Sequence, residues 1–178
     1  GSEPVASAAQ DLFEFAIDRE DVKTHLAVLP PMQPEKRNAV EYELQILKII
    51  CVGWSISYFL ETVSWKQRLA EDYWRAIYEL SGQLSDAAGT LATAPVDYFR
   101  TIQDRLALYV DTLKESAAAR EPAAAIGPAF AATCGSGNDP HITMAGTRMF
   151  AFTVSQVHAY LEHLTCDASK TQNPDTVH

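Results

Sequence analysis

The sequence predicts an all-α fold: a compact bundle of about five to six helices around one central, all-round apolar helix near residues 44–60. Two observations carry this prediction. Apolar residues recur every three or four positions through most of the chain, and the alternating pattern of strands bounded by tight turns does not occur. A chain of 178 residues is also long enough to bury one sizeable core without disulfides or metals.

The two ends of the chain are predicted to lie outside the helical domain. Gly1-Ser2 is typical of the pair left when an affinity tag is cleaved, so residues 1–5 are expected to be a disordered, vector-derived remnant. Residues 165–178 are polar, contain Pro174 and lack an apolar period, which predicts a flexible tail. Residues 6–164 are therefore expected to form a single helical domain.

Two short helical segments are expected before the proline-rich stretch at 30–34. The first is an apolar stripe over residues 12–17. The second begins at Asp18, whose carboxylate can accept hydrogen bonds from the amides of the first turn. The prolines end this segment because proline lacks the amide donor and clashes with the preceding turn.

Residues 35–63 contain the most apolar helix and are predicted to form the centre of the bundle. From Leu44 to Leu60 apolar side chains surround the helix, a pattern typical of a helix buried on every side or placed in lipid. The uninterrupted apolar run is about 12 residues once Lys48 counts as a break, whereas a bilayer needs about 20. Burial in the protein core is therefore favoured, and the small residue Gly53 is expected to let a neighbouring helix approach closely.

The rest of the chain is predicted to be helical with polar breaks. Gly135 is expected to end one helix, and Asp139 and Pro140 to cap and begin the last one, whose apolar residues recur with a 4-3 spacing from Phe150 to Leu164. The expected helices cover residues 65–88, 96–120, 123–133 and 140–164.

Charge and cysteine content narrow the classes of function. Lysine and arginine number 14 against 23 aspartates and glutamates, a net charge of −9. This balance disfavours nucleic-acid binding and attachment to anionic lipid, because both need a basic surface. Three cysteines do not make a disulfide framework, which favours a reducing compartment, most simply a bacterial cytoplasm. No membrane span and no cofactor are predicted.

Residues with catalytic or metal-binding chemistry are few. The nearest approach to a metal-ligand set is His158, Glu162 and His163, where the first two are four residues apart and share a helix face. A divalent ion would need further ligands, so no metal site is predicted. Cys134 and His141 flank a glycine-rich loop, but a helix C-terminus disfavours a thiolate. Enzymatic activity is left open, and a non-enzymatic role is favoured.

Aromatic residues on two consecutive helices are the strongest functional signal. Large rings with polar tips occur in cores, in protein interfaces and in pockets for flat ligands, and all three interpretations stay open here. Because a short link near Ser64 joins the two helices, their rings are expected to converge. The candidate ligand- or partner-binding residues are Trp54, Tyr58, Trp65, Tyr73, Trp74, Tyr78 and, on the last helix, Phe152.

Two functions from different classes follow from these patterns. The first is a non-enzymatic interaction module, an adaptor, chaperone or regulatory protein, whose partner is a protein with a basic surface. A homodimer is also expected, through a second apolar strip on the last helix formed by Met149, Phe152 and Tyr160. The alternative is a binder of a small hydrophobic or flat ligand, or a cofactor-free enzyme, with an aromatic pocket between the central and last helices.

Overall fold

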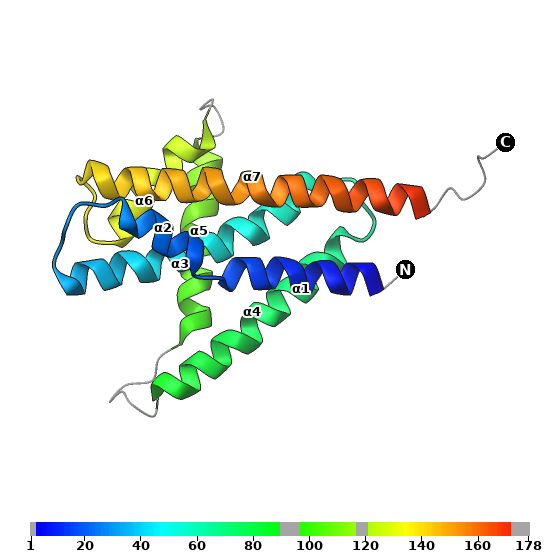
Figure 1. Ribbon diagram of the computed structural model, residues 1–178, viewed down its shortest axis with the longest axis horizontal. Coiled ribbons are helices and arrows are strands. Elements are labelled where there is room, and N and C mark those ends of the chain that lie inside the picture. Colours follow the sequence, from blue (N-terminus) through cyan, green and yellow to red (C-terminus); the bar gives the residue numbers. More distant parts are fainter. Residues whose placement is uncertain (1–2, 90–96, 117–120, 172–178) are drawn as a thin grey trace.

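The computed structural model describes residues 3–89, 97–116 and 121–171, and it confirms the all-α class (Figure 1). These residues contain no strand. They form seven helices, more than the five to six expected: α1 (Glu3–Ile17), α2 (Glu20–Ala27), α3 (Pro34–Phe59), α4 (Lys66–Gly89), α5 (Tyr98–Glu115), α6 (Pro122–Thr133) and α7 (Pro140–Thr171).

Both ends of the helical body extend beyond the predicted boundaries. Helix α1 begins at Glu3, and Val5 is buried in the core rather than belonging to a disordered remnant. Helix α7 continues past Leu164 to Thr171, because loss of an apolar period marks exposure of a helix and not its end. Residues 1–2 and 172–178, parts of the predicted remnant and tail, lie outside the described residues.

Two of the three helix ends that the sequence marked are formed as expected. Asp139 Oδ1 accepts a hydrogen bond from the amide of His141 at 2.9 Å before α7, and Gly135 follows α6 with a φ of +69°, a left-handed conformation that favours glycine. Helix α2 begins at Glu20 and not at Asp18, and its N-cap residue is Arg19, without a side-chain cap. Asp18 Oδ1 accepts a hydrogen bond from the amide of Glu20 at 2.8 Å in the turn before the helix.

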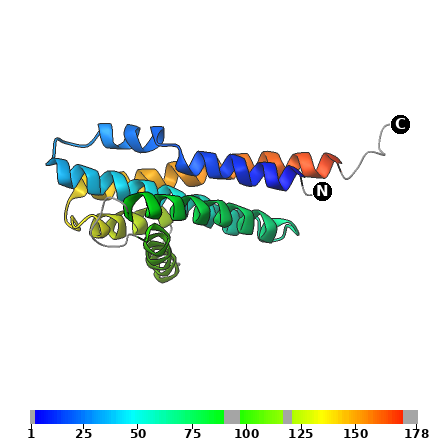
Figure 2. The ribbon, with the colours of Figure 1, turned by 90° about the horizontal axis from the view of Figure 1, so that it is seen from below.

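Helix α3 lies at the centre of the bundle, as predicted. It contacts every other helix, and Figure 2 shows it with α7 between a layer of α1 and α2 and a layer of α4, α5 and α6. Most of its residues from Val40 to Ile56 are buried. No helix in the described part of the chain is both long and apolar enough to cross a membrane.

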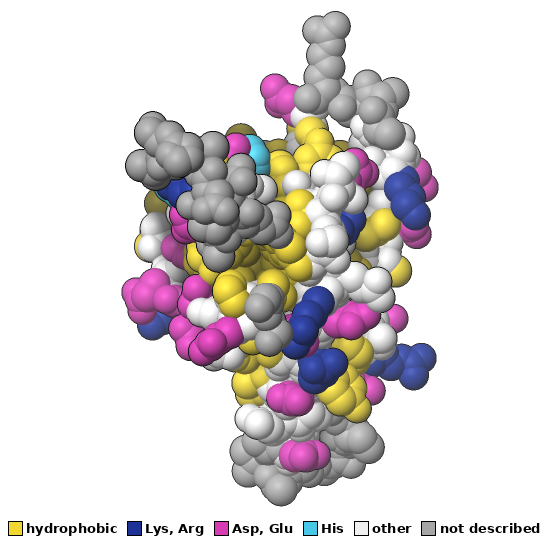
Figure 3. All heavy atoms as spheres, turned by 90° about the vertical axis from the view of Figure 1, so that its right-hand side faces the viewer, with side chains coloured by type: hydrophobic (Ala, Val, Ile, Leu, Met, Phe, Trp, Pro, Cys, Tyr) yellow, Lys and Arg dark blue, Asp and Glu magenta, His cyan; other side chains and the backbone are white. Residues whose placement is uncertain are grey.

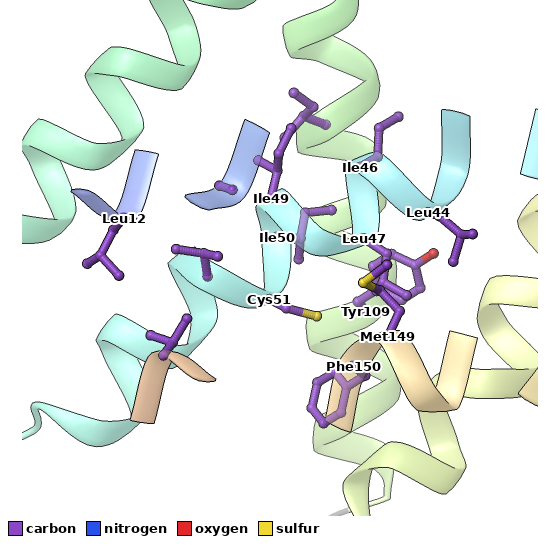
Figure 4. Packing of buried hydrophobic residues seen from close by; sticks show 14 of the residues in the cluster. Leu12, Leu44, Ile46, Leu47, Ile49, Ile50, Cys51, Tyr109, Met149 and Phe150 are labelled. Carbon is purple, nitrogen blue, oxygen red and sulfur yellow. The ribbon is translucent and has the colours of Figure 1, made fainter. Parts of the chain in front are cut away.

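Each of the seven described helices contributes buried residues to one core cluster. Leu44 and Leu47 of α3, Tyr109 of α5, and Met149 and Phe150 of α7 lie together in one cluster of buried residues (Figure 4). Apolar area removed from water stabilises a fold by roughly 25 cal/mol per Å². Burial on this scale explains why helices from distant parts of the chain pack against α3.

Two charged side chains of α3 are buried together with partners. The ammonium group of Lys48, with 0% of the residue exposed, donates to Asp21 Oδ2 at 2.8 Å and to the carbonyl of Asp18 at 3.0 Å. Arg105 of α5 donates to both carboxylate oxygens of Glu43, at 2.7 and 2.9 Å. Buried charges are tolerated when they are paired and hydrogen-bonded. These pairs fix α2 and α5 against the central helix.

Candidate functional site

The structure divides the predicted aromatic residues into separate groups. Trp54 and Tyr58 of α3 stack with ring centroids 4.7 Å apart, and this cluster continues through Phe59 to His158 of α7, whose ring stacks on Phe59 at 4.1 Å. The small cavity lined by Trp54 has a volume of about 10 Å³, which is about the space of one water. Trp54 is half-buried and Tyr58 is 59% exposed, so these stacked rings lie partly at the surface and do not enclose the expected ligand pocket.

Tyr73 and Trp74 of α4 are packing residues against α3. The Tyr73 hydroxyl is buried and donates to the carbonyl of Ile49 at 2.6 Å, and burial raises the pKa of this phenol well above its usual value. The Trp74 ring covers Gly53, where an added Cβ would lie 2.7 Å from Trp74 Cε2. Gly53 therefore allows the close helix approach that the sequence predicted.

The other predicted aromatic residues lie apart from this cluster. Tyr78 is exposed on α4 and meets Phe99 of α5 edge to face, with centroids 5.0 Å apart. Phe152 of α7 is half-buried, and its ring centroid lies 5.7 Å from that of His25 of α2. Trp65, which precedes α4, lines a cleft between α1 and α7. The expectation that all these rings converge is therefore wrong.

The second apolar strip of α7 has neighbours within the chain. Met149 is fully buried, Phe152 contacts His25, and the Tyr160 hydroxyl donates to Asp11 Oδ2 of α1 at 2.7 Å. The sequence predicts a dimer through this strip because one neighbouring helix can cover only one apolar stripe of α7. Helices α1 and α2 contact Phe152 and Tyr160, so these residues no longer indicate a second copy of the chain.

The weak metal candidates share one surface hollow but do not form a ligand set. His158, Glu162 and His163 line this hollow together with Phe59 and Cys166. The His158 Nε2 and Glu162 Oε1 atoms are 3.3 Å apart. No group of three or more His, Cys, Asp or Glu side chains in the described ranges is placed to hold a metal ion.

Two cysteine thiols are held in their protonated form. Burial raises the pKa of Cys134 to about 12, and it raises the pKa of Cys51 in the core even further. Cys134 is also the C-cap residue of α6, where the helix dipole disfavours a thiolate. The structure gives neither thiol the environment of a reactive nucleophile.

An open groove lies between α3, α4 and α5, and the sequence did not predict it. Its floor is formed by Ile46 and Ile49 of α3, Ile77 of α4 and Ile102 of α5, and we call it the isoleucine groove. Its volume is about 390 Å³. Further lining residues are Arg19, Asn38, Glu41, Tyr42, Gln45, Leu80, Ser81, Leu84 and Tyr98.

The rim of the isoleucine groove combines exposed apolar side chains with a neutralised ion pair. Tyr42 is 38% exposed and Leu84 is 48% exposed. Arg19 and Glu41 form a salt bridge of 2.7 Å, so each charge on this side has an opposite partner. Beneath the rim, Gln45 donates to the carbonyl of Ala16 at 2.7 Å, while its buried Oε1 accepts no hydrogen bond from the described residues.

The isoleucine groove was missed because each of its floor residues fits an ordinary core pattern. Ile77 and Ile102 fall on the apolar stripes of their own helices, and Ile46 belongs to the all-round apolar segment. The available signal is at the rim, where Tyr42 and Leu84 extend apolar stripes beyond what the neighbouring helices cover. Helices α3 and α4 cross at an angle and diverge, so their apolar stripes separate at the rim of the groove (Figure 1).

A second hollow, which we call the end cleft, lies between α1 and α7 where α1 begins and α7 ends. Figure 3 looks at this end of the molecule and shows hydrophobic side chains gathered in the middle of the face. The volume of the cleft is about 490 Å³. It is lined by Pro4, Val5, Ser7, Ala8, Asp11, Trp65, Tyr160, Leu164, Asp167 and Ala168.

Comparison with known proteins identifies no relative: no family model, no curated protein and no solved structure matches the chain. The function must therefore be inferred from the isoleucine groove and the end cleft. Both have volumes in the range of about 300–1,000 Å³ that is usual for ligand sites. Both are lined by apolar residues that a ligand can contact. The isoleucine groove carries the Arg19–Glu41 ion pair, whereas Asp11 and Asp167 line the end cleft.

Proposed function

We propose that the protein is a non-enzymatic interaction module whose isoleucine groove receives an apolar segment of a protein partner. The observation that supports this most directly is the pair of apolar side chains left exposed at its rim, Tyr42 and Leu84. The four isoleucines beneath them are buried and give the groove an apolar floor. Exposed apolar patches with a polar border are typical of interaction sites, and a groove between helices suits the apolar face of another helix.

The charge of the chain supports a partner with a basic surface. A net charge of −9 attracts a basic protein over long range and speeds its association at low salt. An adaptor, chaperone or regulatory protein of a bacterial cytoplasm fits this description. A second copy of the chain is the other protein partner to test. We assign the dimer surface to α4 instead of the apolar strip of α7 that contains Phe152.

The proposal is tested by photo-crosslinking in cells at two matched positions. Leu84 on the rim and Met144 on α7 are both 48% exposed, and only Leu84 lines the isoleucine groove. A photoreactive amino acid at Leu84 should give one dominant protein adduct that is missing when the same amino acid replaces Met144. Equal adduct patterns at both positions would contradict the proposal. An adduct with twice the mass of the chain would identify a second copy as the partner.

A small hydrophobic ligand is the second candidate for the isoleucine groove. Its volume supports this alternative, as does the buried Gln45 Oε1, which accepts no hydrogen bond from the described residues. Native mass spectrometry of gently purified protein should then show a bound molecule that is lost in Leu84→Glu, at an exposed position of the groove, and retained in the equally exposed Met144→Glu. A spectrum with no added mass in the unsubstituted protein would count against this candidate.

A further inference from the structure

We propose that the end cleft binds an amphipathic organic cation, a small molecule that joins an apolar body to a protonated or quaternary amine. No residue lines both the end cleft and the isoleucine groove. The end cleft is therefore a second site, and its chemistry differs from that of the site proposed for a protein partner.

The apolar body of the ligand fits the surface between the two helices. Val5 and Ala8 of α1 are buried, and Leu164 and Ala168 of α7 are half-buried on the opposite wall. The small side chains of the two alanines leave the space that a larger residue would fill. An alkyl or ring body placed here would remove this apolar surface from water, which is favourable in proportion to the area covered.

The charge of the cleft selects a cation. The Asp11 carboxylate of α1 lines it, and none of the described lining residues is Lys, Arg or His. The aromatic rings of Trp65 and Tyr160 also line the cleft. Aromatic ring faces attract ammonium groups through their quadrupole, most strongly for tryptophan. Carboxylates and ring faces together are the usual surroundings of a bound organic ammonium.

Tyr160 holds the Asp11 carboxylate across the cleft. Its hydroxyl donates to Asp11 Oδ2 at 2.7 Å. Burial of the hydroxyl, followed by its hydrogen bond to Asp11 and the nearby negative charge, raises the pKa of Tyr160, so the phenol remains a donor at neutral pH. A carboxylate has about four acceptor positions. One hydrogen bond from Tyr160 therefore orients Asp11 and leaves it able to accept from a cation.

Other classes of ligand fit the end cleft less well. An anion would meet the Asp11 carboxylate, and like charges in one site repel. A neutral apolar molecule would remove water from Asp11 without adding a donor to the one that Tyr160 supplies, which costs free energy. A cation compensates that loss directly. The lining therefore distinguishes three molecules with the same apolar chain and different head groups.

The test uses three probes with the same eight-carbon chain: octylammonium, octan-1-ol and octanoate. Isothermal titration calorimetry of the full chain should show one saturable site for octylammonium. Its dissociation constant should be about tenfold lower than that of octan-1-ol, as expected for one ion pair near the surface with a cation–π contact. Octanoate should bind most weakly. No saturable binding of octylammonium, or equal affinity for the three probes, overturns the proposal.

A matched pair of variants locates the binding. Asp11→Asn should weaken octylammonium binding about fivefold and leave octan-1-ol binding unchanged, because only the cation uses the carboxylate. Asp111→Asn, at an exposed position of α5 outside the cleft, makes the same change in net charge and should alter neither affinity. Equal effects of the two variants would show that only net charge matters and would overturn the proposed site.

A third variant checks the aromatic part of the site independently of Asp11. Trp65→Leu should weaken octylammonium binding more than octan-1-ol binding, because leucine retains apolar area and has no ring face. Circular dichroism confirms that each variant is folded. Leu84→Glu in the isoleucine groove should leave octylammonium binding unchanged. Loss of binding in this variant would place the cation in the isoleucine groove and overturn the proposed site.

Discussion

The contact between α6 and α7 and the contact of α3 with α4 and α5 show how residue size decides whether helices close against each other or leave a groove. Between α6 and α7, glycines stand at the helix contact: a Cβ added to Gly146 would lie 2.6 Å from Phe130 Cδ1, and one added to Gly127 would overlap Thr147. On the side of α4 and α5, the facing residues are isoleucines, and the isoleucine groove remains open.

The difference follows from how closely two helix axes can approach. Helices with small residues at their crossing point approach closely, whereas larger side chains hold the axes apart. Helices α3 and α4 show both situations along one pair. They are close where Trp74 covers Gly53, and they diverge toward Tyr42 and Leu84 (Figure 1). Whether two apolar helix faces pack closely or leave a groove therefore depends on how small the residues at their crossing point are.

The largest expected difference is between a core position and a groove-rim position. Ile56→Ala should lower the free energy of unfolding by about 2–5 kcal/mol, because Ile56 is fully buried in α3 and its truncation leaves a cavity. Leu84→Ala should change it by no more than about 0.5 kcal/mol, because Leu84 is exposed. Chemical denaturation measures both values. Similar losses in the two variants would mean that the groove rim is packed.

The Lys48–Asp21 pair should respond unequally to loss of each partner. Asp21→Asn leaves the fully buried ammonium of Lys48 without its counter-ion and should cost about 3 kcal/mol. Lys48→Met leaves a carboxylate whose side chain is 28% exposed and can be hydrated, so the expected cost is about 1–2 kcal/mol. Denaturation midpoints give the order, and a larger loss in Lys48→Met would contradict this account of the pair.

Two glycine substitutions should have opposite signs. Gly146→Ala forces a methyl group against Phe130 and should destabilise the fold by about 1–3 kcal/mol, less any gain in helix propensity. Gly82→Ala in α4 meets no atom within 4 Å and should stabilise by about 0.5–1 kcal/mol. Thermal melts decide the matter, and a stabilised Gly146→Ala would show that the α6–α7 contact is looser than described.

A loss of stability is also expected at alkaline pH. Burial raises the pKa of Tyr73, Cys51 and Cys134 in the folded state, and their unfolded values lie near 9 for thiols and 10 for phenols. The unfolded chain therefore releases these protons first, so stability is fully present below pH 9 and falls above it. The melting temperature should drop by about 2–4 °C for each kcal/mol lost. A flat profile from pH 8 to 11 would contradict the raised pKa values.

The sequence predicts the central helix well and the grooves poorly, for one physical reason. The segment from Leu44 to Leu60 is apolar all round, and that pattern has one solution in water, burial on every side. Whether two apolar stripes meet along their whole length depends on the crossing angle, which a one-dimensional pattern does not contain. The open groove and the separation of Trp65 and Tyr78 from the other aromatic residues both depend on that angle.

The residues that line the end cleft show the same limit. Trp65 was chosen for its ring, and the structure places it in the end cleft, but Asp11 and Tyr160 gave no signal of meeting because they lie on helices far apart in the chain. A polar residue on a helix surface has the same local pattern whether it faces water or another helix. The end of α7 was also set too early, because its polar last turns resemble a loop in composition.

The hydrogen bond between Asp11 and Tyr160 joins residues 149 positions apart. Because closing a long loop costs more chain entropy than closing a short one, contacts of this separation tend to form late in folding. During synthesis α1 leaves the ribosome long before α7, and it meets α3 and α4 first. The end cleft is therefore complete only after the last helix has been made.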